Sequence, residues 1–361
     1  MPPAKSYKVQ GVATLLNTTV DAVRRLGEEF DVKIARQETG PKTRLYSLDN
    51  VFELAARRAQ KRREKSAKSK RVVVTVYAPK GGVGKTTLTG NLGVCFALRG
   101  FKVLLIDLDF QANLTLSLGY DSELTPEEAA EAGIPESSII QHHFGHLMKE
   151  WPTGRQSLKD VIKKPYGEYG PHIIPADLTL DRLDALLLWA SMEGKPSDMG
   201  IASLMQAGMN GKDKDFDIQD YDIVLFDASP SKNRLTKGAL LASDYVISPV
   251  SMEKFSTKAL SYLASVLTEM QDQYGRCPEL AIVGNFFDAN RTRVLRQLLS
   301  ITNAYDNAWI GSTIKRSEDF PKNLNEDLDI PLVLAKPSCN SSGELQSTAE
   351  MLLRRMEMTN G

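Results

Sequence analysis

The stretch RVVVTVYAPKGGVGKTT, residues 71–87, joins a run of β-branched residues to a loop rich in glycine. Its first part, RVVVTVY at 71–77, predicts a strand that is buried on both faces, as strands of parallel sheets are. Its end, GKT at 84–86, matches the end of the phosphate-binding template G-x-x-x-x-G-K-[ST], which lies between a strand and a helix. Pro79 occupies the position of the first template glycine, so the match is to a variant. The stretch therefore predicts a nucleotide-binding α/β fold of the P-loop class.

The glycine-rich loop has the chemistry that a chain of phosphates requires. Gly81, Gly82 and Gly84 let the backbone bend so that its N–H groups point at phosphate oxygens. The helix expected to begin near Thr86 adds the positive end of its dipole. Lys85 is expected to reach the outer phosphates of ATP, and the Thr86 hydroxyl is expected to bind Mg²⁺. One lysine suffices for this purpose, so the second lysine at the front of the loop needs its own explanation.

Further apolar runs follow the loop and alternate with helical patterns at 256–273 and 292–302. This alternation predicts a doubly wound, mostly parallel sheet with helices on both faces. Residues 120–220 are expected to form insertions above the sheet, including a helical stretch over 125–151 with a break at 133–135 and a short strand within 172–180. The buried strands are predicted at 103–109, 221–229, 244–250 and 279–287.

Composition and charge restrict the class of protein. The 361 residues are 42% hydrophobic and 25% charged, without an apolar run long enough to span a membrane or an N-terminal signal pattern. The three cysteines are far apart, which fits a reducing cytosol and gives no metal-ligand pair. Residues 1–71 carry 17 Lys and Arg against 8 Asp and Glu, although the whole chain is neutral. A basic N-terminal unit on an acidic body favours an anionic partner for the first part.

The N-terminal unit begins with a helix-turn-helix candidate over residues 7–30. Two short amphipathic helices are expected to flank a turn at 17–19, with Thr18 and Asp21 forming a capping box for the second helix. Arg24 and Arg25 lie off the apolar stripe of that second helix. Since the second helix of such a motif enters the major groove of DNA, both arginines are candidate DNA contacts.

A candidate wing follows, in which two extended pieces flank the turn at 39–41. Lys42 and Arg44 lie beside its tip, and Ser47 is expected to cap a helix that runs into a basic linker. The segment resembles the winged-helix DNA-binding heads of the MerR type, whose R-x-Y-S-x-x-D-V pattern corresponds here to Arg44, Tyr46, Ser47, Asn50 and Val51. A small helical packing or dimerisation module is the alternative. The expected domains are a head at 1–60, a linker at 61–70 and an ATPase body at 71–361.

The variant loop KGGVGKTT, residues 80–87, is the signature of the deviant Walker A group, and within that group the chain resembles the ParA family of partition ATPases. Four further stretches carry the resemblance, each similar to a motif of the family. Phe110 and Ser229 replace prolines of the family pattern in two of them, which bears on hydrolysis rates more than on the fold. The four stretches are 103–115, 221–231, 242–250 and 287–293.

The resemblance implies roles for individual residues. Lys80 would cross to the other subunit of an ATP-sandwich dimer and contact the phosphates there, as an arginine finger does. Asp227 would hold Mg²⁺ through water, and Asp109 would orient the attacking water beside the metal. Asp107 either supports Asp109 or caps the strand end, and Asn285 would read the adenine edge. The nucleotide-binding loop would comprise Lys80, Gly81, Gly82, Val83, Gly84, Lys85, Thr86 and Thr87.

The resemblance also implies a biological cycle for the chain. An ATP-dependent homodimer with Mg²⁺ would bind chromosomal DNA without sequence preference, and a ParB-type centromere-binding protein would stimulate hydrolysis. The head would bind an operator and repress its own operon, and the protein would be cytoplasmic and nucleoid-associated, with no membrane partner. The expected operator contacts are Arg24, Arg25, Lys42 and Arg44. The expected non-specific DNA contacts are Arg276, Arg291, Arg293, Lys315 and Arg316.

Other classes of function remain as alternatives. A nucleotide-switched transcriptional repressor would need sequence-specific DNA binding but little hydrolysis. A MinD-like membrane-cycling ATPase would need a basic amphipathic C-terminal helix, whereas the tail at 347–361 carries Glu350 and Glu357 among its arginines and is more typical of a packed helix. An iron–sulfur carrier is disfavoured by the absence of paired cysteines. The histidines at 142, 143 and 146 are expected to be structural or exposed and not metal ligands.

Overall fold

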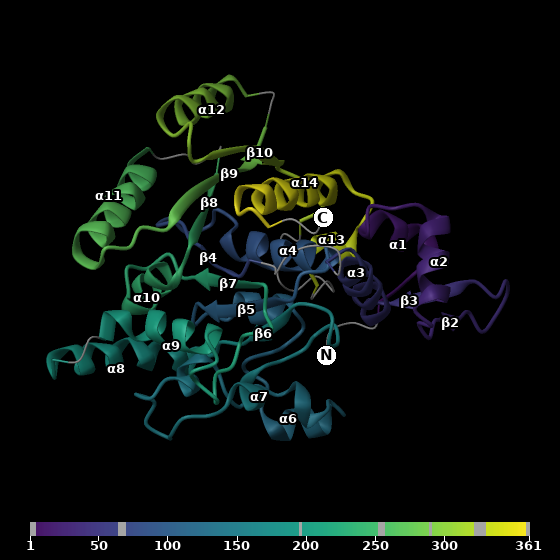
Figure 1. Cartoon of the computed structure of the whole chain (residues 1–361), viewed down its shortest axis with the longest axis horizontal. Helices are drawn as coiled ribbons and strands as arrows, with labels where there is room; N and C mark the ends of the chain where they lie inside the picture. Colours follow the sequence, from purple (N-terminus) through teal and green to yellow (C-terminus); the bar gives the residue numbers. More distant parts are fainter. Residues whose placement is uncertain are drawn as a thin grey trace.

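The computed structural model describes residues 5–63, 70–194, 197–251, 257–288, 291–320 and 330–358. An α/β body occupies most of the molecule, and a smaller N-terminal unit, called the head below, lies at one end of it (Figure 1). The body contains a seven-stranded parallel sheet of order β10-β9-β8-β4-β7-β5-β6. The fold class predicted from the sequence is therefore confirmed. The strands are β4 (Val72–Val76), β5 (Val103–Leu108), β6 (His172–Ile174), β7 (Ile223–Ala228), β8 (Tyr245–Ser251), β9 (Glu279–Phe287) and β10 (Trp309–Lys315).

Helices cover both faces of the sheet because its strands are apolar on both sides. On one face, strand residues such as Val74 and Leu105 pack with helices α4 (Lys85–Leu98), α13 (Leu332–Ala335) and α14 (Asn340–Arg355). On the other, residues such as Val73 and Leu104 pack with the remaining large helices. These are α8 (Asp181–Met192), α9 (Gly200–Met209), α10 (Arg234–Ala242), α11 (Thr257–Tyr274) and α12 (Thr292–Ala304).

The helical prediction for residues 125–151 is largely wrong. Only α6 (Pro126–Glu131) is an α-helix there, followed by single 3₁₀ turns at Glu136–Ser138 and Phe144–Leu147. Gly133, with a φ of 66°, ends α6 in a left-handed conformation, and Pro135 stops the helix from resuming. His143 then accepts a hydrogen bond from the backbone N–H of Gly145 and caps the second 3₁₀ turn. The body also contains two more short helices, α5 (Asn113–Ser117) and α7 (Leu158–Val161).

The head is built from three helices and three short strands in the order β1-α1-α2-β2-β3-α3. Thr19, and not the predicted Thr18, caps α2 by accepting a hydrogen bond from the N–H of Ala22. Thr18 lies one position too early, in the turn opened by Asn17 at a φ of 45°. The elements are β1 (Ser6–Tyr7), α1 (Val9–Leu15), α2 (Val20–Glu29), β2 (Ala35–Arg36), β3 (Arg44–Ser47) and α3 (Leu48–Arg63).

The two extended pieces predicted on either side of the turn at 39–41 form an antiparallel hairpin of β2 and β3. Arg36 pairs with Arg44, and the N–H of Gln37 donates to the carbonyl of Thr43. Ser47 caps α3 as expected, since its hydroxyl accepts from the N–H of Asn50 while the Asn50 side chain accepts from the N–H of Ser47. The asparagine that departs from the family pattern therefore completes a reciprocal cap.

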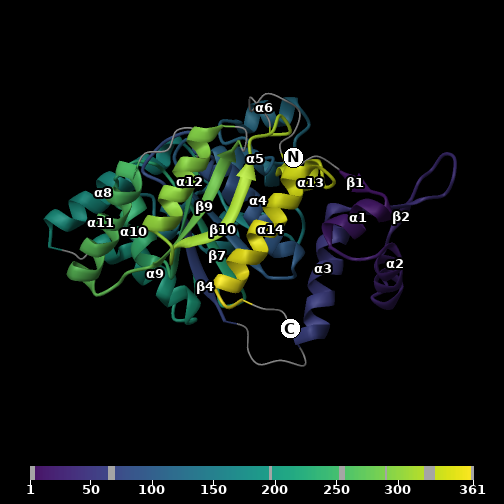
Figure 2. The same cartoon turned by 90° about the horizontal axis from the view of Figure 1, so that it is seen from above.

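The head packs directly on the body through α3, which runs alongside α4 and near α14 in both views (Figures 1 and 2). Gly100, at the end of α4, approaches α3 so closely that an added Cβ would lie 2.2 Å from that of Ala59. The Tyr7 hydroxyl donates to the carbonyl of Leu334 at 2.6 Å, and the ring of Phe52 stacks on Tyr166. Head and body thus share one apolar core. Helix α3 also extends to residue 63, so the predicted linker boundary at residue 60 falls inside it.

Candidate nucleotide-binding site

The glycine-rich loop lies at the carboxyl edge of the sheet, between the end of β4 and the start of α4. Gly82 and Gly84 have φ values of 68° and 84°, the left-handed region that glycine adopts without a steric cost. Gly84 is the N-cap of α4, so the free N–H groups of the first helical turn face the loop. The strand order reverses at β4: β5 and β6 lie on one side of it, and β8, β9 and β10 lie on the other. In open α/β sheets, ligands bind at such a switch point.

Lys85 is the first residue of α4 and is only 8% exposed. Burial lowers the pKa of its ammonium group, while the charges of Asp227 and Asp109 act in the opposite direction. A lysine of this kind is poorly solvated, and its charge is balanced in part by the nearby carboxylates. This arrangement fits the phosphate contact expected from the sequence.

Two carboxyl groups lie side by side beneath the loop. Asp227 on β7 and Asp107 on β5 are direct Cα partners across the two strands, and both are buried. Burial raises the pKa of both groups; for Asp107 the next cause is the neighbouring charge of Asp227. Without a cation, the two negative charges are therefore unfavourable.

The donor set around Asp227 fits Mg²⁺. The Thr89 hydroxyl donates to Oδ1 at 3.0 Å, and hydrogen bonding from Thr86 and Thr89 lowers the pKa that burial raises. Oδ2 is buried and has no hydrogen-bond partner among the described residues. A buried carboxylate oxygen without a partner among the described residues, beside a threonine hydroxyl and a second carboxylate, gives a set of oxygen ligands suited to a hard cation.

Asp109 follows β5 and is only partly buried, so its carboxylate faces the same edge of the sheet. Its Oδ1 accepts from the N–H of Gln111, and its own N–H donates to Asp107 Oδ1 at 3.1 Å. Asp107 Oδ2 accepts from both the N–H and the hydroxyl of Thr115. Asp107 thus contacts both the end of β5 and the segment that carries Asp109, an arrangement compatible with either of the two roles given above.

Sequence reasoning missed two threonines in this network. Thr89 lies one helical turn after Lys85, a spacing that places both on the same side of α4. Thr115 bonds Asp107 and also accepts from the N–H of Ala176, just beyond β6. Thr115 belongs to the stretch 103–115 that carried the resemblance, so its position was a usable signal. Thr89 gave no signal beyond its spacing.

Asn285 lies in β9 next to the loop and is buried. Its amide nitrogen donates to the carbonyl of Val83 at 2.8 Å, and a Cβ on Gly84 would lie 2.5 Å from that nitrogen. Its oxygen accepts from the N–H of Phe286, which has a φ of 53°. Asn285 therefore touches the glycine-rich loop itself, and a role in reading adenine stays a prediction.

The other loop residues are arranged as a phosphate cradle requires. Gly81 and Gly82 are exposed, as is Thr87, whereas Val83 is buried beneath the loop. Lys80 is half-buried at the front edge of the loop, outside the helix that carries Lys85. A role for Lys80 in a second subunit is a prediction about a dimer.

The predicted operator contacts are all in the head, with different surroundings. Arg25 and Lys42 are exposed. Arg24 pairs with Asp21 at 3.2 Å within α2, and Arg44 pairs with Glu28 at 3.0 Å, which ties the hairpin to α2. Exposed pairs of this kind contribute little to stability, so Arg24 is easily released for a ligand. Arg44 has an additional structural role.

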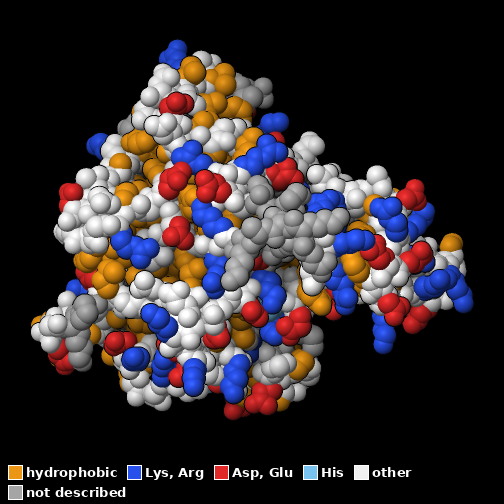
Figure 3. All heavy atoms as spheres, in the orientation of Figure 1, with side chains coloured by type: hydrophobic (Ala, Val, Ile, Leu, Met, Phe, Trp, Pro, Cys, Tyr) orange, Lys and Arg blue, Asp and Glu red, His pale blue; other side chains and the backbone are white. Residues whose placement is uncertain are grey.

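The five predicted body contacts do not form one patch. Arg276 precedes β9 and so lies at the amino edge of the sheet, opposite the glycine-rich loop. Arg291 and Arg293 follow β9, and Lys315 and Arg316 end β10, all at the carboxyl edge. Lys315 pairs with Glu344 and Arg291 with Asp288. On the face shown in Figure 3, Lys and Arg are interspersed with Asp and Glu over the body.

The other titratable clusters among the described residues do not form a metal site. His143 is buried between the Thr179 hydroxyl and the Gly145 N–H, and burial lowers its pKa to about 4. Within the described residues, no group of three His, Cys, Asp or Glu side chains could hold a metal ion.

Across those same residues, no helix is long and apolar enough to cross a membrane. In α14, Leu352 and Leu353 are buried against the body.

Comparison with known proteins gives a consistent result. Residues 71–282 match a family model described as an AAA domain. The chain is 25% identical over 280 residues to Protein IncC of Escherichia coli, covering 77% of this chain and 68% of that one. It is 30% identical over 199 residues to the sporulation initiation inhibitor protein Soj of Bacillus subtilis strain 168, covering 55% and 66%.

A solved structure shares both fold and sequence features with the chain. It is a candidate plasmid partition protein from Borrelia burgdorferi B31 bound to AMPPNP, with 25% identity and a TM-score of 0.56. The alignment covers 79% of this chain and 99% of that one. The family model matches residues 71–282, within the body, and the head lies outside it.

Proposed function

Because the chain belongs to the ParA/MinD-type family of partition ATPases, we propose that it is a DNA-partition protein driven by ATP hydrolysis. The chain is an ATPase that uses ATP and Mg²⁺. The finer steps of the proposal are an ATP-dependent homodimer, non-specific DNA binding by that dimer, and stimulation of hydrolysis by a ParB-type centromere-binding partner. A further step is repression of its own operon through the head.

One observation supports the ATPase chemistry most directly: Lys85, Asp227 and Asp109 converge at the carboxyl edge of the sheet around one glycine-rich loop. Lys85 would bind the outer phosphates, and the N–H groups at the start of α4 would bind their oxygens. Thr86 and Asp227 would hold Mg²⁺, which neutralises charge on the phosphates when it is bound. Asp109, on a loop positioned by Asp107, would orient the attacking water.

The dimer gives Lys80 its proposed role. Half-buried at the front of the loop, Lys80 belongs to the segment that would face a second copy if two nucleotide sites met. A cation delivered from that copy would stabilise charge that develops during phosphoryl transfer, and would make the dimer depend on ATP. The five basic residues proposed to bind DNA fit this scheme only in part, because Arg276 lies at the opposite edge from the other four.

The head supports the proposed autorepression. Its helix-turn-helix, hairpin wing and reciprocal cap agree with the winged-helix pattern inferred from the sequence. Arg25 on α2 and Lys42 beside the hairpin tip are exposed, as contacts to an operator would need to be. Because the head shares a core with the body, nucleotide binding at one end of α4 has a physical route to the head at the other end.

The test of the proposal is binding of the full chain to a random-sequence DNA duplex with ATP, with ADP and without nucleotide, at one fixed salt concentration. The expected result is binding that appears only with ATP. Equal binding in all three conditions would mean that the head alone holds DNA, and a nucleotide-switched repressor would replace the partition cycle. The membrane-cycling alternative lacks a specific observation in its favour, since the apolar side of α14 is buried against the body.

A further inference from the structure

A chain of hydrogen bonds connects the segment after β6 to the carboxylate of Asp109. The N–H of Ala176, two residues beyond β6, donates to Thr115 Oγ1 at 3.0 Å. The Thr115 hydroxyl donates to Asp107 Oδ2 at 2.8 Å, and Asp107 Oδ1 accepts from the N–H of Asp109 at 3.1 Å. Asp109 Oδ1 then accepts from the N–H of Gln111. Thr115 is therefore the link between Ala176 and the two aspartates.

The partners of the Thr115 hydroxyl fix its orientation. A hydroxyl has one proton to donate, and an amide N–H can only donate. Because the N–H of Ala176 occupies a lone pair of Oγ1, the Thr115 proton is left for Asp107 Oδ2. Thr115 is 0% exposed, so bulk water does not compete for either bond. Thr89 differs in this respect, since its single proton is shared between two acceptors.

Asp107 transmits this orientation because both of its carboxylate oxygens are in use. Oδ2 accepts from the hydroxyl and from the N–H of Thr115, and Oδ1 accepts from the N–H of Asp109. A carboxylate group is planar, so a rotation that takes Oδ2 away from Thr115 also takes Oδ1 away from Asp109. The bonds from Thr115 therefore hold in place the acceptor to which the backbone of Asp109 is attached.

Asp109 needs support of this kind because the strand that leads to it has ended. Strand β5 ends at Leu108, and Asp109 is only half-buried in the turn that follows. That turn runs to Ala112, which has a φ of 51° and precedes α5, the helix that contains Thr115. The hydrogen bonds to Asp107 thus hold this segment at both ends. A group that orients an attacking water must be held within about 0.5 Å of its productive position.

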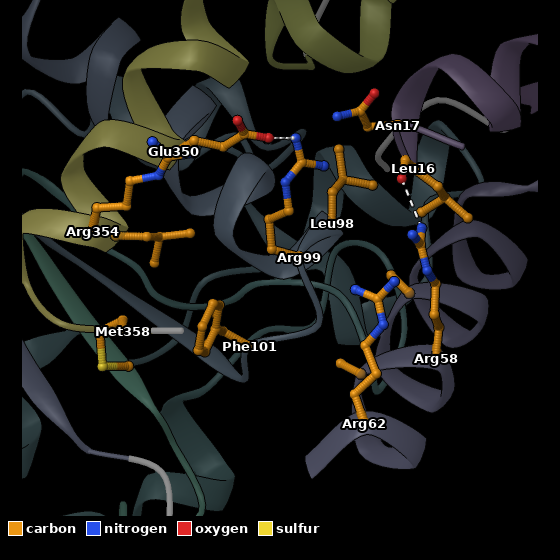
Figure 4. A pocket seen from close by; sticks show the side chains of 13 residues that line it. Leu16, Asn17, Arg58, Arg62, Leu98, Arg99, Phe101, Glu350, Arg354 and Met358 are labelled. Carbon is orange, nitrogen blue, oxygen red and sulfur yellow. Dashed lines mark hydrogen bonds and ion pairs between the residues drawn. The ribbon is translucent and has the colours of Figure 1, made fainter. Parts of the chain in front are cut away.

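Other hydrogen bonds between distant segments hold the fold together without reaching the site. A pocket of about 410 Å³ lies between the head and the body. Among the residues that line it, Arg58 donates to the carbonyl of Leu16, and Arg99 pairs with Glu350 (Figure 4). These contacts join helices within the head and within the body, and none of the four residues belongs to the nucleotide site. Thr115 is different, because its hydroxyl and its N–H both donate to a carboxylate of that site.

We propose that Thr115 is a positioning residue for ATP hydrolysis, which acts through Asp107 on Asp109. This inference rests on the proposed role of Asp109 in orienting the attacking water. Loss of the Thr115 hydroxyl releases the Asp109 segment but leaves Lys85 and the glycine-rich loop in place. ATP binding is therefore retained, while the hydrolysis step becomes slower. The bond from Ala176 includes the segment after β6 in the same network.

The test compares variants of the full chain with the wild type. Thr115→Val removes the hydroxyl, and Thr115→Ser keeps the hydroxyl while it removes a methyl group. Thr115→Ala is a second variant without the hydroxyl, for the case that valine prevents folding. Thr348→Val is the matched control, because Thr348 on α14 is also 0% exposed. Its hydroxyl bonds the carbonyl of Glu344 at 2.8 Å and the Ser312 hydroxyl at 2.5 Å, away from the glycine-rich loop.

We expect Thr115→Val to hydrolyse Mg²⁺-ATP at least tenfold more slowly than the wild type in a single turnover, with an affinity for AMPPNP within twofold. Thr115→Ser and Thr348→Val should both stay within threefold of the wild-type rate. A second readout needs no nucleotide: the backbone amides of residues 109–115 should exchange with solvent at least tenfold faster in Thr115→Val. A merely structural role of Thr115 would not separate the rate of hydrolysis from the affinity.

Asp109→Asn distinguishes failure of this inference from failure of the proposed function. If Asp109→Asn loses turnover while Thr115→Val and Thr115→Ala keep the wild-type rate, Thr115 does not position Asp109, and the proposed role of Asp109 stands. If Asp109→Asn itself hydrolyses ATP at the wild-type rate, that proposed role is wrong and the positioning has no target. An equal loss of rate in Thr115→Val and Thr115→Ser, or a loss of AMPPNP affinity that matches the loss of rate, would also overturn the inference.

Discussion

Thr89 on α4 donates a hydrogen bond to the buried carboxylate of Asp227 on β7, with 3.0 Å between Oγ1 and Oδ1. The same oxygen lies 3.0 Å from the carbonyl oxygen of Lys85 one turn earlier, so its single proton is shared between the two acceptors. A single side chain thus connects the helix that carries the proposed phosphate-binding lysine to the strand that carries the proposed metal-binding carboxylate.

The first prediction is that Thr89→Val destabilises the chain and weakens binding of Mg²⁺-ATP. Valine has nearly the same shape but removes the Thr89 donor from buried Asp227 Oδ1, and the loss of a hydrogen bond to a buried acceptor costs about 1–3 kcal/mol. Urea unfolding measures the stability, and a fluorescent ATP analogue measures the affinity. Thr268→Val is the control, because Thr268 lies at an exposed position of α11 and its hydroxyl makes only the bond to a carbonyl one turn earlier. If both variants lose the same stability, the bond to Asp227 contributes nothing.

The second prediction separates the two lysines of the loop. Lys85→Ala is expected to lose nucleotide binding, because Lys85 is the buried cation beside Asp227 and Asp109. Lys80→Ala is expected to bind ATP within a few-fold of wild type but to lose about 10³-fold in turnover, the scale of an arginine finger. Equilibrium binding and steady-state phosphate release measure the two effects. Turnover of Lys80→Ala at the wild-type rate would contradict a role in a second subunit.

The third prediction concerns pH and the carboxylate pair. A carboxyl group whose pKa is raised by folding holds its proton more tightly when folded, so the stability it contributes is lost as the pH rises above about 4. Both Asp107 and Asp227 shift in this direction. Without Mg²⁺, the free energy of unfolding should therefore fall between pH 5 and pH 8, and added Mg²⁺-ATP should oppose the loss.

Asp227→Asn tests this assignment, because it removes one of the two charges. The variant is expected to be more stable than wild type at pH 8 without Mg²⁺, with a Tm higher by about 2–4 °C for each kcal/mol gained. It should also lose the benefit of Mg²⁺-ATP. Thermal unfolding at pH 5 and pH 8 measures both effects. A variant less stable than wild type at pH 8 would show that the neighbouring charges of Asp107 and Asp227 do not destabilise the folded protein.

The buried central strands of the sheet could be predicted from the sequence, whereas several other elements could not. Continuous β-branched runs such as 71–77 allow little besides a buried parallel strand. Strand β10 was missed because Trp309–Lys315 lies at an edge, is interrupted by Gly311 and is only partly buried. The stretch 125–151 was misjudged because its apolar spacing suits a helix, while its glycines and His143 favour short turns.

The sequence indicates which residues of the candidate site come together, but not the contacts that surround them. Motif positions identified Lys85, Asp109 and Asp227, and neighbouring parallel strands bring such residues to one edge. The bond from Asn285 to the Val83 carbonyl depends on a residue two hundred positions away, so no local pattern contains it. The packing of the head on the body could not be predicted for the same reason, because only the fold brings Gly100 close to α3.

The fourth prediction addresses operator binding by the head. Arg25→Ala and Lys42→Ala are each expected to weaken binding to the operator and to lower the slope of log affinity against log salt by about 1, as the loss of one phosphate contact does. The ATPase rate should stay unchanged. Lys212→Ala is the control, since Lys212 is an exposed lysine of the body. Footprints and salt slopes identical to wild type would exclude these residues from the DNA contact.

The fifth prediction is that Gly100→Ala loosens the head without affecting nucleotide binding. At a φ of 82°, alanine is strained, and its Cβ would also lie 2.2 Å from that of Ala59 and 2.8 Å from the carbonyl oxygen of Ala55. Overpacking of this kind costs about 1–3 kcal/mol beyond the backbone strain. Hydrogen exchange should therefore become faster in α1, α2 and α3, while ATP affinity at the other end of α4 stays near wild type.

Gly275→Ala separates the two costs, because Gly275 has a φ of 64° but no atom within 4 Å of an added Cβ. This control carries the left-handed strain alone, about 1–2 kcal/mol, and lies far from the head in the chain. A larger loss of stability in Gly100→Ala, together with faster exchange confined to the head, would establish that the end of α4 holds the head in place. Equal losses in the two variants, with exchange in α1–α3 unchanged, would mean that α3 tolerates the alanine and that the shared core does not depend on this contact.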